Sequence, residues 1–121
     1  MLITGHSGFT GSWLSLVLKN YNAKIYGVSL KPKTYPSMFD LMKIKKRIKK
    51  NYFCDIRNLN KIQNIFKLVS PDIIFHLAAQ PLVKEAIVNP KETLETNIIG
   101  TSHILKASIN LVSLKKVVII T

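Results

Sequence analysis

The sequence is poor in cysteine, in acidic residues and in long apolar runs. Its one cysteine, Cys54, excludes an internal disulfide and is typical of proteins from a reducing compartment. No apolar run approaches the ~20 residues of a membrane span, and the first residues lack the basic, apolar and small-residue pattern of a signal peptide. No two residues among the three histidines and Cys54 are spaced as metal ligands. These absences predict a cytoplasmic protein that binds neither a metal nor a membrane.

The shortage of acids leaves a strong positive charge. The chain has 18 Lys and Arg residues against 6 Asp and Glu residues, a net charge of +12. Much of this charge lies in residues 43–50, where Ile44 and Ile48 recur at helical spacing. We interpret residues 38–50 as containing an amphipathic helix with a solvated, lysine-covered face. Because no aromatic residues alternate with the lysines as a stacking surface requires, we expect no nucleic-acid partner.

Three glycines at every third position, Gly5, Gly8 and Gly11, follow a short apolar run and precede an apolar segment over residues 12–20. Glycine permits a positive φ and places no Cβ between the backbone and a ligand. The helix that follows directs free N–H groups at the turn, where they can hold a phosphate. This strand–turn–helix context predicts a dinucleotide pyrophosphate site, and an ordinary tight turn is the alternative.

Apolar segments and turn signals alternate along the rest of the chain. Strands are predicted at 1–4, 24–30, 52–54, 73–77 and 115–121, and helices at 12–20, 58–69 (with Asn58 or Asn60 as the cap) and 82–111 (interrupted near Pro90). The predicted helix 12–20 has a wide apolar face, which predicts a sandwiched helix; the face consists of Trp13, Leu14, Leu16, Val17 and Leu18. Strands that alternate with helices predict an α/β fold: a doubly wound parallel sheet of the Rossmann type, in one dinucleotide-binding domain over residues 1–121.

The acidic residue that usually follows the second strand and binds the ribose hydroxyls of NAD is missing. The end of that strand reads Ser29, Leu30, Lys31. Ser29 could hydrogen-bond a ribose hydroxyl, whereas Lys31 or Lys33 could meet the 2′-phosphate of NADP. The residues alone therefore leave the choice between NAD and NADP open.

Together these motifs resemble the extended short-chain dehydrogenases/reductases. The glycine turn, Asp55 with Ile56, the His-Leu-Ala-Ala block at 76–79 and the Thr-Asn-Ile-Ile-Gly-Thr block at 96–101 carry the resemblance. Within that superfamily, residues 4–14, 36–39, 55–57 and 75–83 are similar to CDP-glucose 4,6-dehydratases. The similarity covers nearly the whole chain, and its specific parts are the Gly-His-Ser-Gly-Phe and Ala-Ala-Gln-Pro-Leu-Val blocks.

The resemblance implies a nucleotide-sugar 4,6-dehydratase that holds NAD tightly and that is a homo-oligomer when full length. Such an enzyme moves a hydride from sugar C4 to NAD, eliminates water across C5 and C6, and returns the hydride to C6; CDP-glucose is the implied substrate. Asp55 would accept from the adenine amino group, and residues 77–80 would line the ribose and nicotinamide. The cofactor-binding residues that the resemblance implies are Gly5, His6, Gly8, Phe9, Thr10, Gly11, Ser29, Asp55, Ile56, Leu77, Ala78, Ala79, Gln80 and Asn97.

The sequence departs from the family in two places. Thr10 stands where the family has a lysine, and no Tyr is followed by Lys four positions later. In the family the last matched strand is followed by the catalytic hydroxyl, carboxylate and Tyr-x-x-x-Lys pair. We therefore expect no catalytic residues within this chain, a sheet incomplete on its C-terminal side, and no dehydratase activity from this chain alone. The strand at 117–121 would be a hydrophobic edge that favours self-association.

Two other functions stay open at this point: a related nucleotide-sugar epimerase or reductase, and a non-catalytic dinucleotide sensor or scaffold. Among single residues, we interpret His76, His103 and Cys54 as structural. His6 is given equal weight as a structural and a ligand-binding residue. Asn97 is interpreted first as a polar tie between helix and strand, and Gln80 and Lys84 as weak candidates for contact with the sugar nucleotide.

Overall fold

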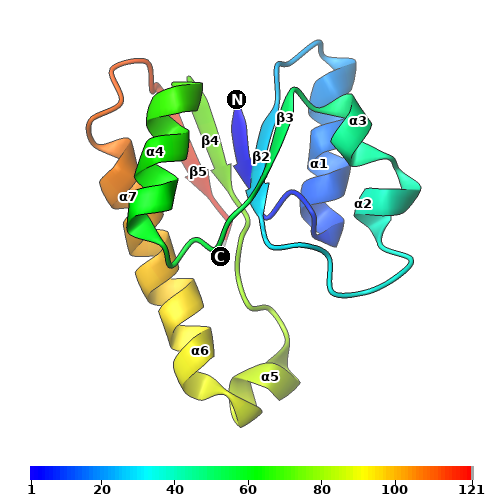
Figure 1. Ribbon diagram of the computed structural model, residues 1–121, viewed down its shortest axis with the longest axis vertical. Helices are drawn as coiled ribbons and strands as arrows, with labels where there is room; N and C mark the ends of the chain where they lie inside the picture. The colour runs from blue at the N-terminus through cyan, green and yellow to red at the C-terminus, as the bar shows by residue number, and fades with distance from the viewer. Residues whose placement is uncertain (121) are drawn as a thin grey trace.

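The computed structural model describes residues 1–120 and contains one five-stranded sheet with helices on both faces (Figure 1). All strand pairings are parallel, and the spatial order is β3-β2-β1-β4-β5. The strands are β1 (Leu2–Thr4), β2 (Tyr26–Ser29), β3 (Lys50–Phe53), β4 (Ile73–His76) and β5 (Lys116–Ile119). This arrangement confirms the predicted doubly wound α/β fold.

The helices form two layers that cover opposite faces of the sheet (Figure 1). The first layer holds α1 (Phe9–Asn20), α2 (Met38–Leu41) and α3 (Ile44–Arg47), and the second holds α4 (Leu59–Val69) and α7 (Thr101–Ser108). Between β4 and α7 lie α5 (Val83–Val88), α6 (Pro90–Leu94) and a π-helical turn, η1 (Glu95–Gly100). In Figure 1, α5 and α6 extend past the carboxyl ends of the strands. The connection after β1 goes to one face of the sheet and the connection after β4 leads to the other (Figure 1). Sheets of this kind open a crevice between two such strands.

Two apolar clusters, one on each face, hold these layers together. Leu2 and Ile3, neighbours on β1, are both fully buried but belong to different clusters, since successive side chains of a strand point to opposite faces. Leu2 packs with residues of the α4 and α7 layer, such as Phe66, and Ile3 packs with residues of the α1–α3 layer, such as Ile44. Burying each such side chain contributes about 1.5–3 kcal/mol.

The prediction of one amphipathic helix within residues 38–50 is wrong. The segment forms two helices of 4 residues each, α2 and α3, because Lys43 between them has a left-handed backbone with a φ of 51°. The turn lets Phe39 and Ile44 both enter the same apolar cluster. Lys50, expected at the end of the helix, is the first residue of β3.

Helix α1 also differs from its prediction. It begins at Phe9, inside the glycine turn, and its buried residues are the small ones, Gly11, Ser12 and Ser15. Trp13 and Val17 are 45% and 46% exposed, so the expected sandwiched helix is wrong. Small side chains on the sheet side let α1 lie close to β1, while its leucines pack partly buried against the core and Trp13 and Val17 stay exposed.

The remaining boundaries follow the sequence more closely. Asn58 is the cap of α4, with its side chain accepting from Lys61 N at 3.1 Å. Pro90 interrupts the long helical region as the first residue of α6, although the π-helical turn was not predicted. The strand predicted over 115–121 is β5, and Thr121 lies outside the described residues. No helix among the described residues is long and apolar enough to span a membrane.

The outer side of β5 leads to the first prediction. Within residues 1–120, β5 pairs only with β4, and Ile120 beside it is 54% exposed. An unpaired strand of Val and Ile residues is a template for pairing with another chain. We expect the chain to self-associate with rising concentration in sedimentation velocity, and Val118→Lys to reduce that association. The control is Val112→Lys, which adds the same charge at a fully exposed position outside the sheet. A wild-type chain that stays monomeric at high concentration contradicts the prediction.

Candidate functional site

The glycine turn lies at the carboxyl end of β1, against the segment that follows β4. Gly5 has a φ of 74°, and a Cβ added to it would lie 2.7 Å from Ala78 N. The turn is held by Gly5 N donating to Val28 O at 2.8 Å and Gly8 N donating to Gly5 O at 3.0 Å. A Cβ on Gly11 would collide with Gly5 O, whereas Gly8 meets only that oxygen, at 3.3 Å. Gly5 and Gly11 are therefore required for packing, and Gly8 leaves an open, exposed position.

The first turn of α1 faces this open position without a side-chain cap. The N-cap is Gly8, which has no side-chain oxygen to accept from the helix N–H groups. Ser12 Oγ donates instead to His6 O at 3.1 Å, and Phe9 and Thr10 are exposed. Free N–H groups and the positive end of the helix dipole are what a phosphate requires. The predicted pyrophosphate contacts at Gly8, Phe9 and Thr10 thus lie together around one accessible helix end.

His6 lies inside the fold, away from this opening. Its side chain is fully buried, and its Nε2 bonds Asn51 Oδ1 on β3, a partner that sequence reasoning missed. The ring packs edge-on to Phe39 and fills the space in front of Gly27. Burial lowers the pKa of His6, with the Asn51 contact opposing that effect. The fold therefore encloses the side chain of His6, and its Nδ1 has no hydrogen-bond partner among the described residues.

Ser29, at the end of β2, is also enclosed. Its residue exposure is 4%, and its Oγ has no hydrogen-bond partner among the described residues. A ribose hydroxyl would supply that missing partner if the covering side chains moved. Lys31, the candidate for a 2′-phosphate, lies with its Nζ 5.9 Å from the centre of the Phe53 ring.

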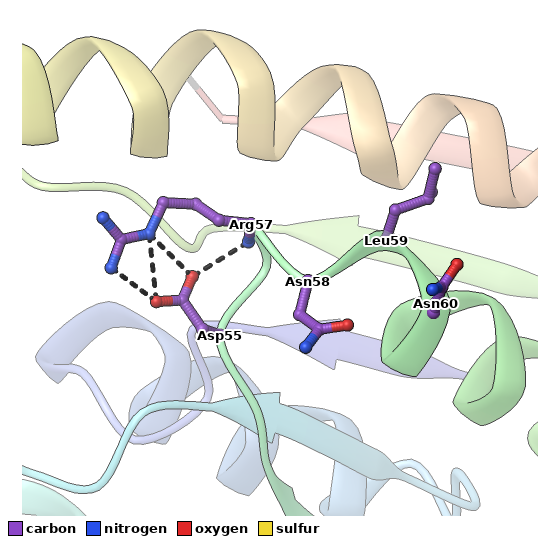
Figure 2. Close-up of a pocket in the computed structure, with 5 residues that line it drawn as sticks. All are labelled: Asp55, Arg57, Asn58, Leu59 and Asn60. Carbon is purple, nitrogen blue, oxygen red and sulfur yellow. Dashed lines mark hydrogen bonds and ion pairs between the residues drawn. The ribbon is translucent and has the colours of Figure 1, made fainter.

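Asp55, predicted to bind adenine, is engaged by Arg57 in the loop after β3 (Figure 2). Arg57 Nη2 donates to Asp55 Oδ2 at 2.7 Å, and Arg57 N donates to Asp55 Oδ1 at 2.9 Å. These bonds to Arg57 lower the pKa of Asp55. Both side chains are about one-third exposed and border a shallow pocket with residues 58–60, so the carboxylate is oriented yet accessible.

Arg57 itself was missed in the sequence, although it follows Asp55 closely. Its guanidinium also lies 3.6 Å from a Glu92 oxygen and 3.7 Å from a Glu95 oxygen. The side-chain hydrogen bonds to Asp55 raise the pKa of Arg57 above its ordinary value. Arg57 thereby ties the loop after β3 to α6 and to the π-helical turn.

Ile56 and Cys54, the neighbours of Asp55, point into the core. Ile56 is 4% exposed and fills the space that a Cβ on Gly100 would need. Cys54 is buried and donates weakly from Sγ to Asp55 O at 3.3 Å, and burial raises its pKa. Both residues belong to the buried core under the loop, as predicted for Cys54. Ile56 therefore offers a ligand only its main chain.

The segment after β4, residues 77–80, lies on the other side of the candidate site from α1, against the glycine turn. We call this segment the cofactor wall. Leu77 N donates to Thr4 O at 3.1 Å, which continues the β1–β4 ladder by one residue. Asn97 in the π-helical turn holds Gln80 from both sides: Asn97 Oδ1 accepts from Gln80 N at 2.8 Å, and Asn97 Nδ2 donates to Gln80 O at 3.1 Å. Asn97 therefore ties the π-helical turn to the segment after β4, whereas the tie was predicted to reach a strand. The main chain of Leu77 and Ala78 lies directly against Gly5 in the glycine turn.

His76, at the end of β4, is 2% exposed and bonded on both ring nitrogens. Nδ1 lies 2.6 Å from Thr4 Oγ1, and Nε2 lies 2.9 Å from Thr101 Oγ1. His103 Nδ1 lies 3.3 Å from Ile56 O. Both histidines thus have hydrogen-bond partners within the fold, which is what the structural interpretation requires. Among residues 1–120 no group of three His, Cys, Asp or Glu side chains is placed to hold a metal.

Comparison with known proteins identifies the family. The profile of the GDP-mannose 4,6 dehydratase family matches residues 2–121. The chain belongs to this family. A CDP-glucose 4,6-dehydratase from Salmonella typhimurium is 40% identical over 121 residues, which are 100% of this chain and 33% of that protein. The similarity to CDP-glucose 4,6-dehydratases inferred from the motifs is thereby confirmed.

Solved structures from the same group share the fold. A UDP-glucose 4-epimerase from Thermotoga maritima, solved with UDP-glucose, is 29% identical with a TM-score of 0.84, over 98% of this chain and 36% of that one. MoeE5, solved with UDP-glucose and NAD, is 26% identical with a TM-score of 0.75, over 98% of this chain and 34% of that one. This member of the family thus spans about a third of the length of the relatives it matches.

The glycine geometry predicts different costs for two substitutions. Gly5→Ala forces a left-handed alanine, at about 1–2 kcal/mol, and brings its Cβ to 2.7 Å from Ala78 N. We expect it to lower the free energy of unfolding by at least about 2 kcal/mol in urea titrations. Gly8→Ala is the matched control, because its φ of −75° suits alanine, and a change of no more than about 1 kcal/mol is expected at this cap. Equal losses for the two variants would contradict this account.

The two buried histidines predict a pH dependence of stability. Burial lowers the pKa of both His6 and His76 below the value of 6.5 expected for the unfolded chain. The unfolded state therefore binds more protons below that value, and the histidine contribution, complete above pH 6.5, is lost as the pH falls toward the lower folded pKa. We expect the free energy of unfolding to be smaller at pH 5.5 than at pH 7.5, by at most about 1.4 kcal/mol per pH unit per histidine. His76→Gln should reduce this slope, and a flat profile over that range would refute it.

Proposed function

We propose that this chain is the dinucleotide-binding part of a nucleotide-sugar 4,6-dehydratase, with NAD as the cofactor and CDP-glucose as the substrate of the whole enzyme. The observation that carries the proposal is the uncapped first turn of α1 beside the open position at Gly8, which is bonded to Gly5 where Gly5 meets the main chain of Ala78. A pyrophosphate suits that cradle, because it accepts from several N–H groups at once. The 40% identity with the Salmonella dehydratase supports the reaction class and the substrate.

The residues present fit NAD in separate places. N–H groups at Phe9 and Thr10 would hold the pyrophosphate, the exposed face of Asp55 would accept from the adenine amino group, and Ser29 would gain the partner it lacks. Residues 77–80 would support the nicotinamide side. When bound, NAD supplies a reversible hydride acceptor. The tasks of this chain are to bind and orient it beside the sheet end.

The wider parts of the proposal follow from the same family relationship. The 121 residues form one dinucleotide-binding domain, and the residues that perform acid–base catalysis lie outside them, so the chain alone binds NAD without dehydratase activity. The whole enzyme acts as a cytoplasmic homo-oligomer. A second candidate is a nucleotide-sugar 4-epimerase, which the similarity to the Thermotoga structure with UDP-glucose favours.

Isothermal titration calorimetry on the 121-residue chain tests the binding half of the proposal. We expect NAD to bind more tightly than NADP, because Lys31 already faces Phe53. Gly8→Ala should weaken NAD binding at least about tenfold, or ~1.4 kcal/mol, because its Cβ enters the cradle. Lys84→Ala, an exposed position beyond residues 77–80, is the control and should bind as the wild type does.

The same titration decides the alternatives. A folded wild-type chain that binds neither dinucleotide would overturn the proposal. Tighter binding of NADP would overturn the choice of cofactor and direct attention to Lys31 and Lys33.

The reaction class is tested separately, by supplying CDP-glucose or UDP-glucose to the full-length protein with NAD and identifying the product by mass spectrometry. A product 18 Da lighter than its substrate is expected for a dehydratase, since one water is lost, and an unchanged mass with an inverted C4 centre supports the epimerase.

A further inference from the structure

One chain of hydrogen bonds runs through the buried end of β4 and links the glycine turn to the π-helical turn. It begins at Ala78 N, which lies 3.2 Å from Thr4 Oγ1, and continues to His76 Nδ1 at 2.6 Å. On the other side of the ring, His76 Nε2 lies 2.9 Å from Thr101 Oγ1, which lies 2.7 Å from Asn97 O. The proposed function uses residues 77–80 but assigns no role to His76 or Thr101.

Simple valence rules fix the direction of every bond in this chain. A carbonyl oxygen only accepts, so Thr101 Oγ1 spends its one proton on Asn97 O and must accept from His76 Nε2. A backbone N–H only donates, so Thr4 Oγ1 accepts from Ala78. With Nε2 carrying the ring proton of a neutral imidazole, Nδ1 accepts from the Thr4 hydroxyl. One tautomer of His76 therefore satisfies every partner.

The other ring states leave a buried group without a partner. The Nδ1–H tautomer would put a bare nitrogen opposite Thr101, whose proton is already used, and would leave the Thr4 hydroxyl proton without an acceptor. The cation would leave the Thr4 hydroxyl proton without an acceptor. Burial of His76 lowers its pKa and so favours the neutral ring. Thr4 and His76 are 0% and 2% exposed, so water cannot replace a lost partner without rearrangement.

We infer that His76, as the Nε2–H tautomer, is a positioning residue that holds the main chain of residues 77–80 in the shape of the cofactor wall. At one end, this series of hydrogen bonds holds Ala78 through Thr4. At the other end, it holds the carbonyl of Asn97, whose side chain bonds both N and O of Gln80. Both ends of the wall thus depend on one imidazole. The positioning itself is a property of this chain, and its consequence for NAD rests on the proposed function.

The first test reads the tautomer of the wild-type chain directly. The two ring nitrogens of a neutral histidine differ in 15N chemical shift according to which carries the proton. We expect the His76 resonances at pH 7.5 to report protonated Nε2 and unprotonated Nδ1. A protonated Nδ1, with Nε2 bare, would overturn the inference whatever the variants show.

The second test removes one partner at constant shape. Thr101→Val keeps the β-branched side chain but loses the hydroxyl, whereas Thr101→Ser keeps the hydroxyl. Thr93→Val is the matched control, because Thr93 Oγ1 also donates four residues back, to Asn89 O at 3.1 Å, with no link to His76. We expect amide exchange at Ala78 and Gln80 to be about tenfold faster in Thr101→Val than in Thr93→Val. The Ser variant should restore the wild-type rates.

NAD titrations of the same variants separate this inference from the proposed function. Faster exchange in Thr101→Val with a parallel loss of NAD affinity, both restored by Ser, supports the two together. If Thr101→Val exchanges faster but the wild-type chain binds no dinucleotide, the positioning role stands and the proposed function is rejected. Equal exchange and equal affinity in Thr101→Val and Thr93→Val rejects the positioning role while NAD binding by the wild type stands.

Discussion

The contact between the main chains of Gly5 and Ala78 is the constraint on which the candidate site depends. A Cβ at Gly5 would lie 2.7 Å from Ala78 N, so β1 and the segment after β4 can meet only if the residue between them has no side chain. The chain leaves β1 toward the α1 layer and leaves β4 toward the α7 layer. The two departures open a crevice beside this contact, where a pyrophosphate can approach the backbone.

Polar groups around that crevice are held mostly by one another. His76 is bonded on both ring nitrogens, and Asn97 holds Gln80 through both amide atoms. Arg57 forms ion pairs with Asp55, with Glu92 of α6 and with Glu95 of the π-helical turn. Because buried polar groups are costly when unpaired, the bonds of His76 hold the loops around it in one arrangement, while the partly exposed ion pairs of Arg57 add less. Ser29 Oγ stays unpaired among the described residues, and a bound ribose hydroxyl would relieve that cost.

Much of the fold followed from local pattern, and the failures have physical causes. Apolar runs located all five strands to within a few residues, and Asn58 and Pro90 marked their helix ends correctly. The helix predicted within 38–50 failed because a left-handed turn at Lys43 brings two apolar residues to the core, and tertiary packing outweighed the helical spacing. No local pattern signals a π-helical turn, which is defined by bonds one residue longer than usual.

By itself the sequence determined the glycine turn, the alternation of strands and helices, and the family, because these depend on backbone freedom and apolar spacing that each segment carries alone. Only the tertiary structure decided that His6 faces Asn51 inside the fold while Asp55 stays oriented and accessible. It also decided that His76 joins Thr4 to Thr101, which are 97 residues apart in the chain (101 minus 4). Such partners are chosen by which strands and helices become neighbours, and that choice is made by the packing of the whole sheet.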